Sequence, residues 1–133
     1  MTNITKPEKI DEGISELFRM IGQPVRVRIL LVIGTGEACV CHLEAYLGER
    51  QAAISQHLIV LRDSGLVQKH RDGRNIYYRL ARPEILELVH EAASILGITP
   101  EEMNDFISKP ALPCGCPRCN PDGPGCKPST GVS

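Results

Sequence analysis

The sequence has no tryptophan and few aromatic residues of any kind. Aromatic residues make up 4% of its 133 positions, whereas the hydrophobic fraction as a whole is 42%. Because strands are enriched in aromatic and β-branched residues, this composition disfavours an all-β fold. The length is sufficient for one compact domain with a core, plus an appendage. We therefore expect a mainly helical domain.

Long hydrophobic runs are also missing. The longest aliphatic run, residues 29–33, is too short to span a bilayer. The opening stretch MTNITKPEKIDEG is polar and mixed in charge, so it lacks the apolar segment of a signal peptide. We expect a cytoplasmic protein without a membrane partner. Thiols stay reduced in that compartment, so the six cysteines are expected to be ligands or sensors rather than a disulfide framework.

Catalytic constellations are not recognisable either. The chain shows no Ser-His-Asp set, no phosphate-binding loop and no pair of carboxylates at a catalytic spacing. Glu101 and Glu102 follow Thr99 and Pro100, and they fit the acidic first turn of a helix. The sequence therefore indicates that the protein is not an enzyme.

Positive charge is concentrated in one part of a nearly neutral chain. The formal net charge is -1, yet residues 50–82 hold seven basic residues against two acidic ones, a local charge of +5. The basic residues of this window are Arg50, Arg62, Lys69, Arg71, Arg74, Arg79 and Arg82. A local basic face on a neutral protein is typical of nucleic-acid binding.

Helical spacing of apolar residues runs through the first half of the chain. Residues 8–21 predict an amphipathic helix. Pro24 suits the first position of a second helix, which is apolar on most sides and so buried, and which ends at residues 34–36. Helices over 39–47 and 51–63 meet across the tight turn 48–50, and this pair resembles a helix-turn-helix.

An alternating pattern replaces the helical one after Gly65. Two alternating segments flank Asp72-Gly73, a step that favours a tight hairpin turn. A long helix is expected from Pro83, and a short one from Pro100 to about residue 107 with Thr99 as its N-cap. The predicted fold class is mainly α with a two-stranded β wing, a winged helix-turn-helix.

The last residues have a different composition. Residues 110–133 hold six of the ten prolines and four of the six cysteines, namely Cys114, Cys116, Cys119 and Cys126. A segment so poor in large apolar groups cannot pack a core of its own. We therefore divide the chain into a winged helix-turn-helix domain, residues 1–109, that carries the candidate DNA-binding elements, and a Cys/Pro/Gly-rich flexible tail, residues 110–133, that supplies metal ligands.

The helix over 51–63 is a candidate for entry into the major groove of DNA. Its front half carries polar side chains that can reach bases or phosphates, and the wing adds basic ones. The candidate DNA-binding residues are Gln51, Ser55, Gln56 and His57 on the helix and Lys69, Arg71 and Arg74 on the wing. Arg74, at the wing tip, is placed to enter a minor groove. His57 has an alternative role as a hydrogen-bonded packing residue beside Leu58.

Cys39 and Cys41 lie too close in sequence to share an ion within a regular helix. Residues two apart point about 200° away from each other there. At the start of a helix this constraint relaxes. With Cys39 at the cap and Cys41 in the first turn, both sulfur atoms can approach one centre at the roughly 2.3 Å of a zinc–thiolate bond. The helix N-terminus also favours the thiolate form that binds metal.

Four stretches together resemble the arsenic-repressor (ArsR/SmtB) family of metal-sensing bacterial repressors. They are LFRMIGQPVRVRILLVI, EACVCHLEAYLG, ISQHLIVLRDSGLV and RDGRNIYYRL. They follow one another between Leu17 and Leu80, and the resemblance extends to nearly everything except the tail. It implies a winged-helix homodimer joined through the first and last long helices. It also implies a repressor that leaves its operator, a double-stranded DNA site, when an ion binds.

The resemblance also bears on the ion. Arsenic-sensing relatives commonly have a third cysteine three residues after the second, where this chain has Glu44. Some relatives complete their site with cysteines from a terminal extension. We therefore expect Cys39 and Cys41 to bind an ion with Cys114 and Cys116 of the tail. Sulfur ligands select soft ions, so As(III) or Sb(III) is the expected inducer, with Cd(II), Pb(II) or Zn(II) as alternatives.

The cysteines allow three other interpretations. Cys39 and Cys41 can be small core residues beside a passive tail. The four tail cysteines, in the pattern C-x-C-x2-C-x6-C, can form a structural zinc site of their own. Cys116 and Cys119 can take part in thiol-disulfide exchange, although the βαβ context of an oxidoreductase is missing. Thiol oxidation also remains open as the signal that releases DNA.

Overall fold

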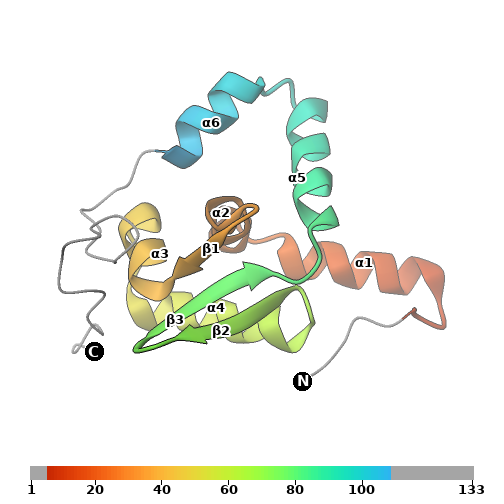
Figure 1. The fold of residues 1–133 in the computed structure, drawn as a ribbon. Coiled ribbons are helices and arrows are strands. Elements are labelled where there is room, and N and C mark those ends of the chain that lie inside the picture. Colours follow the sequence, from red (N-terminus) through yellow and green to blue (C-terminus); the bar gives the residue numbers. More distant parts are fainter. Residues whose placement is uncertain (1–5, 109–133) are drawn as a thin grey trace.

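The structure, a computed structural model, describes residues 6–108. The fold is mainly helical, with a small sheet (Figure 1). In chain order the elements are α1 (Ile10–Ile21), α2 (Pro24–Ile33), β1 (Glu37–Cys39), α3 (Val40–Leu47), α4 (Gln51–Asp63), β2 (Val67–Asp72), β3 (Asn75–Leu80), α5 (Glu84–Ile95) and α6 (Pro100–Ser108). The predicted helices and hairpin are all present, which confirms the predicted fold class. The tail cysteines and the boundary at residue 109 lie outside the described residues.

The buried helix is α2, as its sequence, apolar on most sides, predicts. Pro24 is its first residue, and Ile29 and Leu30 are fully buried. Around them pack apolar side chains from α3, α4, α5 and the start of β2. In Figure 1, α2 lies inside the ring formed by the sheet, α3, α5 and α6, while α1 projects to one side. One core therefore supports both the helix-turn-helix and the wing.

The sheet contains a strand that the sequence did not reveal. Its order is β1-β3-β2, with both pairs antiparallel, so β3 is central. Cys39, the last residue of β1, lies opposite Tyr77 of β3. His70 Nδ1 of β2 lies 3.1 Å from Glu37 Oε2 of β1, a contact that spans the central strand. The expected two-stranded wing is thus the outer part of a three-stranded sheet.

The turns that shape the helix-turn-helix and the wing depend on glycine at positive φ. Gly48 ends α3 in the left-handed conformation with φ 69°. Gly73 follows Asp72 at the hairpin tip with φ 63°, the first central position of a type II′ turn. L-residues with a Cβ rarely adopt these angles, so the chain reverses direction where the sequence predicted.

The last helix, α6, packs back onto α2. Its start is a capping box in which the Glu102 N–H donates to Thr99 Oγ1 and the Thr99 N–H donates to a Glu102 carboxylate oxygen, as the expected N-cap requires. These bonds hold the pKa of Glu102 below its usual range. At the other end, the Phe106 ring lies over the Arg28 guanidinium, 5.2 Å from centroid to Cζ.

Candidate nucleic-acid interface and thiol site

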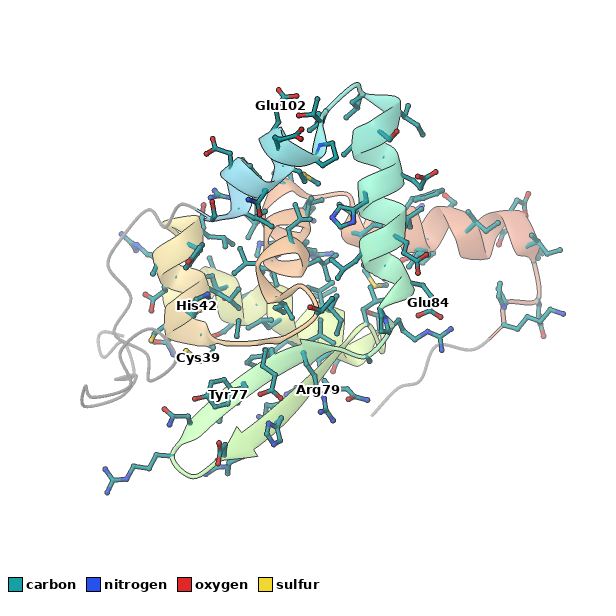
Figure 2. All side chains as sticks on the ribbon, turned by 45° about the horizontal axis from the view of Figure 1, so that its top comes forward. Cys39, His42, Tyr77, Arg79, Glu84 and Glu102 are labelled. Carbon is teal, nitrogen blue, oxygen red and sulfur yellow. The ribbon has the colours of Figure 1, made fainter. Side chains whose placement is uncertain are left out.

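Cys39 lies where the sheet meets the helix-turn-helix (Figure 2). Cys39 ends β1 and is also the N-cap of α3, where its sulfur accepts a hydrogen bond from the His42 N–H at 3.4 Å. Cys41 lies in the first turn of α3. The two sulfur atoms are 3.7 Å apart. The expected arrangement, a cap residue followed by a first-turn residue, is what the structure shows.

The sulfur separation matches the geometry of a shared soft ion. Two thiolates at about 2.3 Å from one tetrahedral centre are separated by about 3.8 Å. The observed 3.7 Å is close to that separation, and Cys41, which is disulfide-bonded in the structure, must be reduced before its sulfur can bind an ion. Cys39 is 2% exposed and packs with Tyr77 and Cys41 in a small cluster apart from the main core. Burial fits the core-residue interpretation as well, so it does not decide between the two roles.

The pair is not a complete site by itself. Among residues 6–108, no group of three or more His, Cys, Asp or Glu side chains is placed to hold a metal ion. Glu44, the position of the third cysteine in arsenic-sensing relatives, lies on α3 and does not create such a group. The expected ligands Cys114 and Cys116 lie outside the described residues. The assignment of these cysteines to one site stays a prediction.

The candidate DNA-binding residues of α4 do not all share one face. Ile54, Leu58 and Leu61 are buried against the core, so the opposite face is turned outward. Gln56 lies on that outward face and is exposed. The other three candidates are half-buried on its flanks, namely Gln51, Ser55 and His57. Gln56 is therefore the best placed of the four to meet a base edge, and all four assignments stay predictions.

His57 is connected to the rest of the domain by Arg26 of α2. The Arg26 Nε–H donates to His57 Nδ1 at 3.1 Å, and Arg26 Nη1 donates to the Met20 carbonyl at 2.8 Å. Burial lowers the pKa of His57, the positive charge of Arg26 lowers it further, and Glu49 opposes the shift. Because Nδ1 accepts from Arg26, Nε2–H is left as the donor of the ring. The alternative of a hydrogen-bonded packing residue fits these contacts, and Nε2–H remains suited to a phosphate or base acceptor.

The basic residues of the wing are exposed. Lys69 and Arg71 lie on β2, and Arg74 lies in the turn at the wing tip. Arg50 is exposed at the N-cap of α4. Helix α4 packs against β2, which places the wing beside the candidate recognition helix. Arg50, Lys69, Arg71 and Arg74 therefore place exposed positive charge on one helix–wing region, formed by α4 and the β2–β3 hairpin.

Two exposed apolar residues lie on α4, whose outward face was expected from the sequence to be polar. Ile59 is 46% exposed and Val60 is 36% exposed. They follow Gln56 by three and four residues, the spacing of neighbours on a helix surface. The signal was present in the sequence, because these two positions do not belong to the buried stripe of Ile54, Leu58 and Leu61.

A large apolar surface lies on the side of the molecule formed by α1, α5 and α6. Ile10, Ile14 and Phe18 form an exposed stripe along α1, with exposed fractions of 69%, 50% and 51%. A groove of about 630 Å³ runs beside it and is lined mainly by apolar side chains of α1, α2, α5 and α6. Contiguous exposed apolar surface of this kind marks a site of association.

Three comparisons relate this chain to known proteins. A family described as "Bacterial regulatory protein, arsR family" matches residues 23–69. The transcriptional repressor SmtB homolog of Synechocystis is 36% identical over 85 residues, 64% of this chain and 64% of that protein, so slightly less than two thirds of the relative is spanned. The arsenic resistance transcriptional regulator ArsR2 of Pseudomonas putida is 36% identical over 98 residues, 73% of this chain and 82% of that protein.

The fold is also that of known repressors. The crystal structure of the AntR antimony-specific transcriptional repressor superposes with a TM-score of 0.61 at 26% identity, over 68% of this chain and 83% of that one. These relatives are regulators of transcription and not enzymes, in agreement with the sequence prediction. Within residues 6–108, no helix combines the length and apolar character that crossing a bilayer requires.

Proposed function

Because the chain belongs to the ArsR/SmtB family of transcriptional repressors, we propose that it binds operator DNA as a homodimer and releases it when a thiophilic ion binds its cysteines. The proposed ligands are Cys39 and Cys41 with Cys114 and Cys116 of the tail. As(III) or Sb(III) is the proposed inducer, and Cd(II), Pb(II) or Zn(II) are the alternatives. The observation that carries the proposal is the pair of sulfur atoms, 3.7 Å apart, at the first turn of α3.

The position of this pair connects the ion to both DNA-binding elements. Cys39 ends β1, which pairs with β3 of the wing, and it begins α3, which packs on α4. Movement of Cys39 and Cys41 toward additional ligands therefore acts on the wing and on the recognition helix together. In a dimer, a small rotation of either element disturbs the contacts at both half-sites.

The coupling also has a required thermodynamic consequence. If the ion weakens operator binding by a given factor, the operator must weaken ion binding by the same factor. For the usual coupling of about 1–3 kcal/mol, this factor is about 5 to 150. Measuring ion affinity with and without operator DNA is therefore a second, independent test of the same mechanism.

The end of α6 is held close enough to α3 for a tail of the same subunit to complete the site. Arg28 donates to the carbonyl oxygens of Tyr46 and Leu47 at the C-terminal end of α3, and Phe106 lies over the same guanidinium. From there, α3 extends over only about 12 Å to its N-terminus. The six residues from Ser108 to Cys114 span up to about 20 Å when extended. Chain length therefore supports a site within one subunit.

The sulfur ligands of the proposed site support one class of ion. Thiolate ligands favour soft ions over hard ones. Two relatives bear names that mention arsenic and antimony, the arsenic resistance regulator of Pseudomonas putida and the antimony-specific repressor. Both elements form trivalent ions that take sulfur ligands. These names support As(III) or Sb(III) as the first ions to test.

The proposed homodimer is supported by the apolar surface of α1, α5 and α6. The exposed stripe of Ile10, Ile14 and Phe18 and the adjoining groove offer a second copy of the chain a self-complementary face. Helix α4 and the wing are not part of this surface. A second copy can therefore bind there and leave α4 and the wing turned toward DNA.

The test is operator binding by the reduced full-length protein, titrated with arsenite, antimonite, Cd(II), Pb(II) and Zn(II). We expect release of DNA by arsenite or antimonite. We expect this response to be lost in Cys39→Ser and in the double variant Cys114→Ser/Cys116→Ser, while their affinity for DNA without ion is unchanged.

The matched control is the double variant Cys119→Ser/Cys126→Ser, which removes two tail thiols outside the proposed site. It should respond like the wild type. Loss of the response in this control would instead indicate a site within the tail. Release unaffected by Cys114→Ser/Cys116→Ser would disprove the shared site, and release by peroxide alone would indicate redox sensing.

A further inference from the structure

The outward face of α4 carries an apolar pair, Ile59 and Val60, that the core does not use. The buried face of the same helix consists of Ile54, Leu58 and Leu61, each at most 1% exposed. Ile59 and Val60 lie on the other side at 46% and 36% exposed. Gln56, three and four residues earlier, lies on the surface between them. The apolar pair therefore flanks the residue best placed to meet a base edge.

We propose that Ile59 and Val60 contact the C5-methyl group of a thymine in the major groove of the operator. This inference rests on the proposed DNA-binding function and adds a determinant of its sequence specificity. In the major groove, the methyl group of thymine is the apolar feature that distinguishes one base from the others. An apolar side chain placed against any other base edge leaves a polar donor or acceptor without its water.

The spacing along α4 places this thymine next to the base pair that Gln56 meets. Three residues of helix advance about 4.5 Å along the axis. Successive base pairs are about 3.4 Å apart. Gln56 is suited to a bidentate contact with adenine. Each half-site is therefore expected to contain an adenine that Gln56 contacts and, at the adjacent base pair, a thymine that Ile59 and Val60 contact.

The charge around the apolar pair favours DNA over a protein partner. Arg50 is exposed at the start of α4, and Lys69, Arg71 and Arg74 are exposed on the adjacent wing. These side chains suit phosphates on either side of a groove. The exposed acid next to the pair, Asp63, has Arg62 beside it, with the Arg62 Nε 3.9 Å from Asp63 Oδ1. The apolar surface assigned to the second copy lies on α1, α5 and α6, so the pair on α4 is left for the operator.

The test uses operator duplexes selected by the full-length reduced protein from a random-sequence pool. Each thymine of the selected site is replaced in turn by uracil, which lacks only the C5-methyl group. The base pair contacted by Gln56 is identified as the position at which Gln56→Ala no longer discriminates between the four bases. We expect uracil at the adjacent position to weaken wild-type binding about fourfold, the factor for burial of one methyl group.

The double variant Ile59→Ala/Val60→Ala should bind the thymine duplex about fourfold or more weakly and should no longer distinguish uracil from thymine. Its thermal stability should be equal or higher, because both side chains are exposed and alanine is the better helix former. Arg74→Ala is the control, since it should weaken binding to all duplexes and keep the uracil penalty.

Two results would overturn the inference. One is an equal uracil penalty in the wild type and in Ile59→Ala/Val60→Ala. The other is a wild type that binds its selected site without regard to any thymine methyl group. If the wild type selects no sequence at all, the proposed repressor function fails together with the inference. If Ile59→Ala/Val60→Ala has the mass of a monomer, the pair belongs to a protein interface, and the inference is also overturned.

Discussion

The sulfur of Cys39 accepts the hydrogen bond that caps α3, and it is also a proposed ligand. Two substitutions separate these roles. Cys39→Ser supplies an oxygen that can accept from the His42 N–H, and serine is among the preferred N-cap residues, so we expect little change in stability. Cys39→Ala removes the cap and should lower the free energy of unfolding by about 1 kcal/mol. Urea denaturation of both variants measures this difference.

The same two variants should be alike in their response to the ion. Neither provides a thiolate at residue 39, so both should keep operator DNA at ion concentrations that release it from the wild type. If Cys39→Ser responds like the wild type, the sulfur is a capping and packing atom only. The core-residue interpretation of the sequence would then be correct.

The Arg26–His57 hydrogen bond predicts a dependence of stability on pH. Burial and Arg26 hold the pKa of His57 below its unfolded value of about 6.5. A base with a lowered pKa binds its proton more readily in the unfolded chain, so stability rises with pH in this range. The contribution is fully present above about pH 6.5, and it is lost as pH falls through the lowered pKa of the folded state.

His57→Gln is the matched variant, because the glutamine carbonyl can accept from Arg26 and does not titrate. We expect the stability of the wild type to fall more steeply than that of His57→Gln between about pH 7 and pH 5. Urea midpoints at several pH values give the comparison. All other titratable groups are common to the two proteins, so only the difference between them reports on His57. Parallel curves would show that neither burial nor Arg26 lowers the pKa of His57 in the folded protein.

Individual elements differ in how far the sequence could predict them. The start of α2 at Pro24, the span of α4 and the hairpin at Gly73 follow from local spacing and turn chemistry, and all three agree with the structure. Strand β1 does not. Its three residues, Glu-Ala-Cys, are too short to show an alternating pattern, and the strand forms because β3 offers a free edge for pairing.

Contacts between distant elements were likewise beyond the sequence. Arg26 and His57 are 31 positions apart, and Arg28 and Tyr46 are 18 apart. Local periodicity carries no information about such pairs, because only the packing of α2 against α3 and α4 brings them together. The cap position of Cys39, in contrast, was predictable from the helix boundary. The sequence therefore located the sulfur pair but not the contacts that connect it to the DNA-binding elements.

Helix α6 is joined to α3 through Arg28, and a double-mutant cycle can measure that connection. Arg28 donates to two carbonyl oxygens at the end of α3 and lies under the Phe106 ring. Phe106→Leu removes the ring, and Arg28→Met removes the charge and the donors. We expect a coupling between them of about 0.5–1 kcal/mol, the strength of an exposed cation–π pair. Urea unfolding of the two single variants and the double variant gives this energy.

Function should respond to Phe106→Leu in one respect only. Phe106 lies two residues before the end of α6, where the tail begins. A looser α6 lowers the effective concentration of the tail thiols near α3 and should weaken ion binding. Operator affinity without ion should change little, because α6 lies away from α4 and the wing and leucine keeps an apolar side chain in the groove assigned to the second copy. Unchanged ion affinity would show that the tail does not depend on α6 for its position.

The whole molecule exposes an apolar stripe on α1 that a stable monomer has no reason to keep. Phe18 is 51% exposed, so Phe18→Asp should leave the fold of a single chain intact. If a second copy covers α1, the new charge is buried at the interface, and the dimer dissociates. We expect a monomer mass in sedimentation equilibrium. Operator binding should weaken about a hundredfold or more, because linkage of the two half-site contacts is lost.

Ser15→Asp places the same charge on the same helix but within a polar surface formed by Asp11, Glu12, Glu16 and Arg19. This control should remain dimeric and bind operator DNA like the wild type. A dimer that survives Phe18→Asp would place the interface elsewhere, and a wild type that is monomeric at micromolar concentration would contradict the dimer itself. The two half-sites would then be bound independently, and a rotation of one recognition helix would no longer release both.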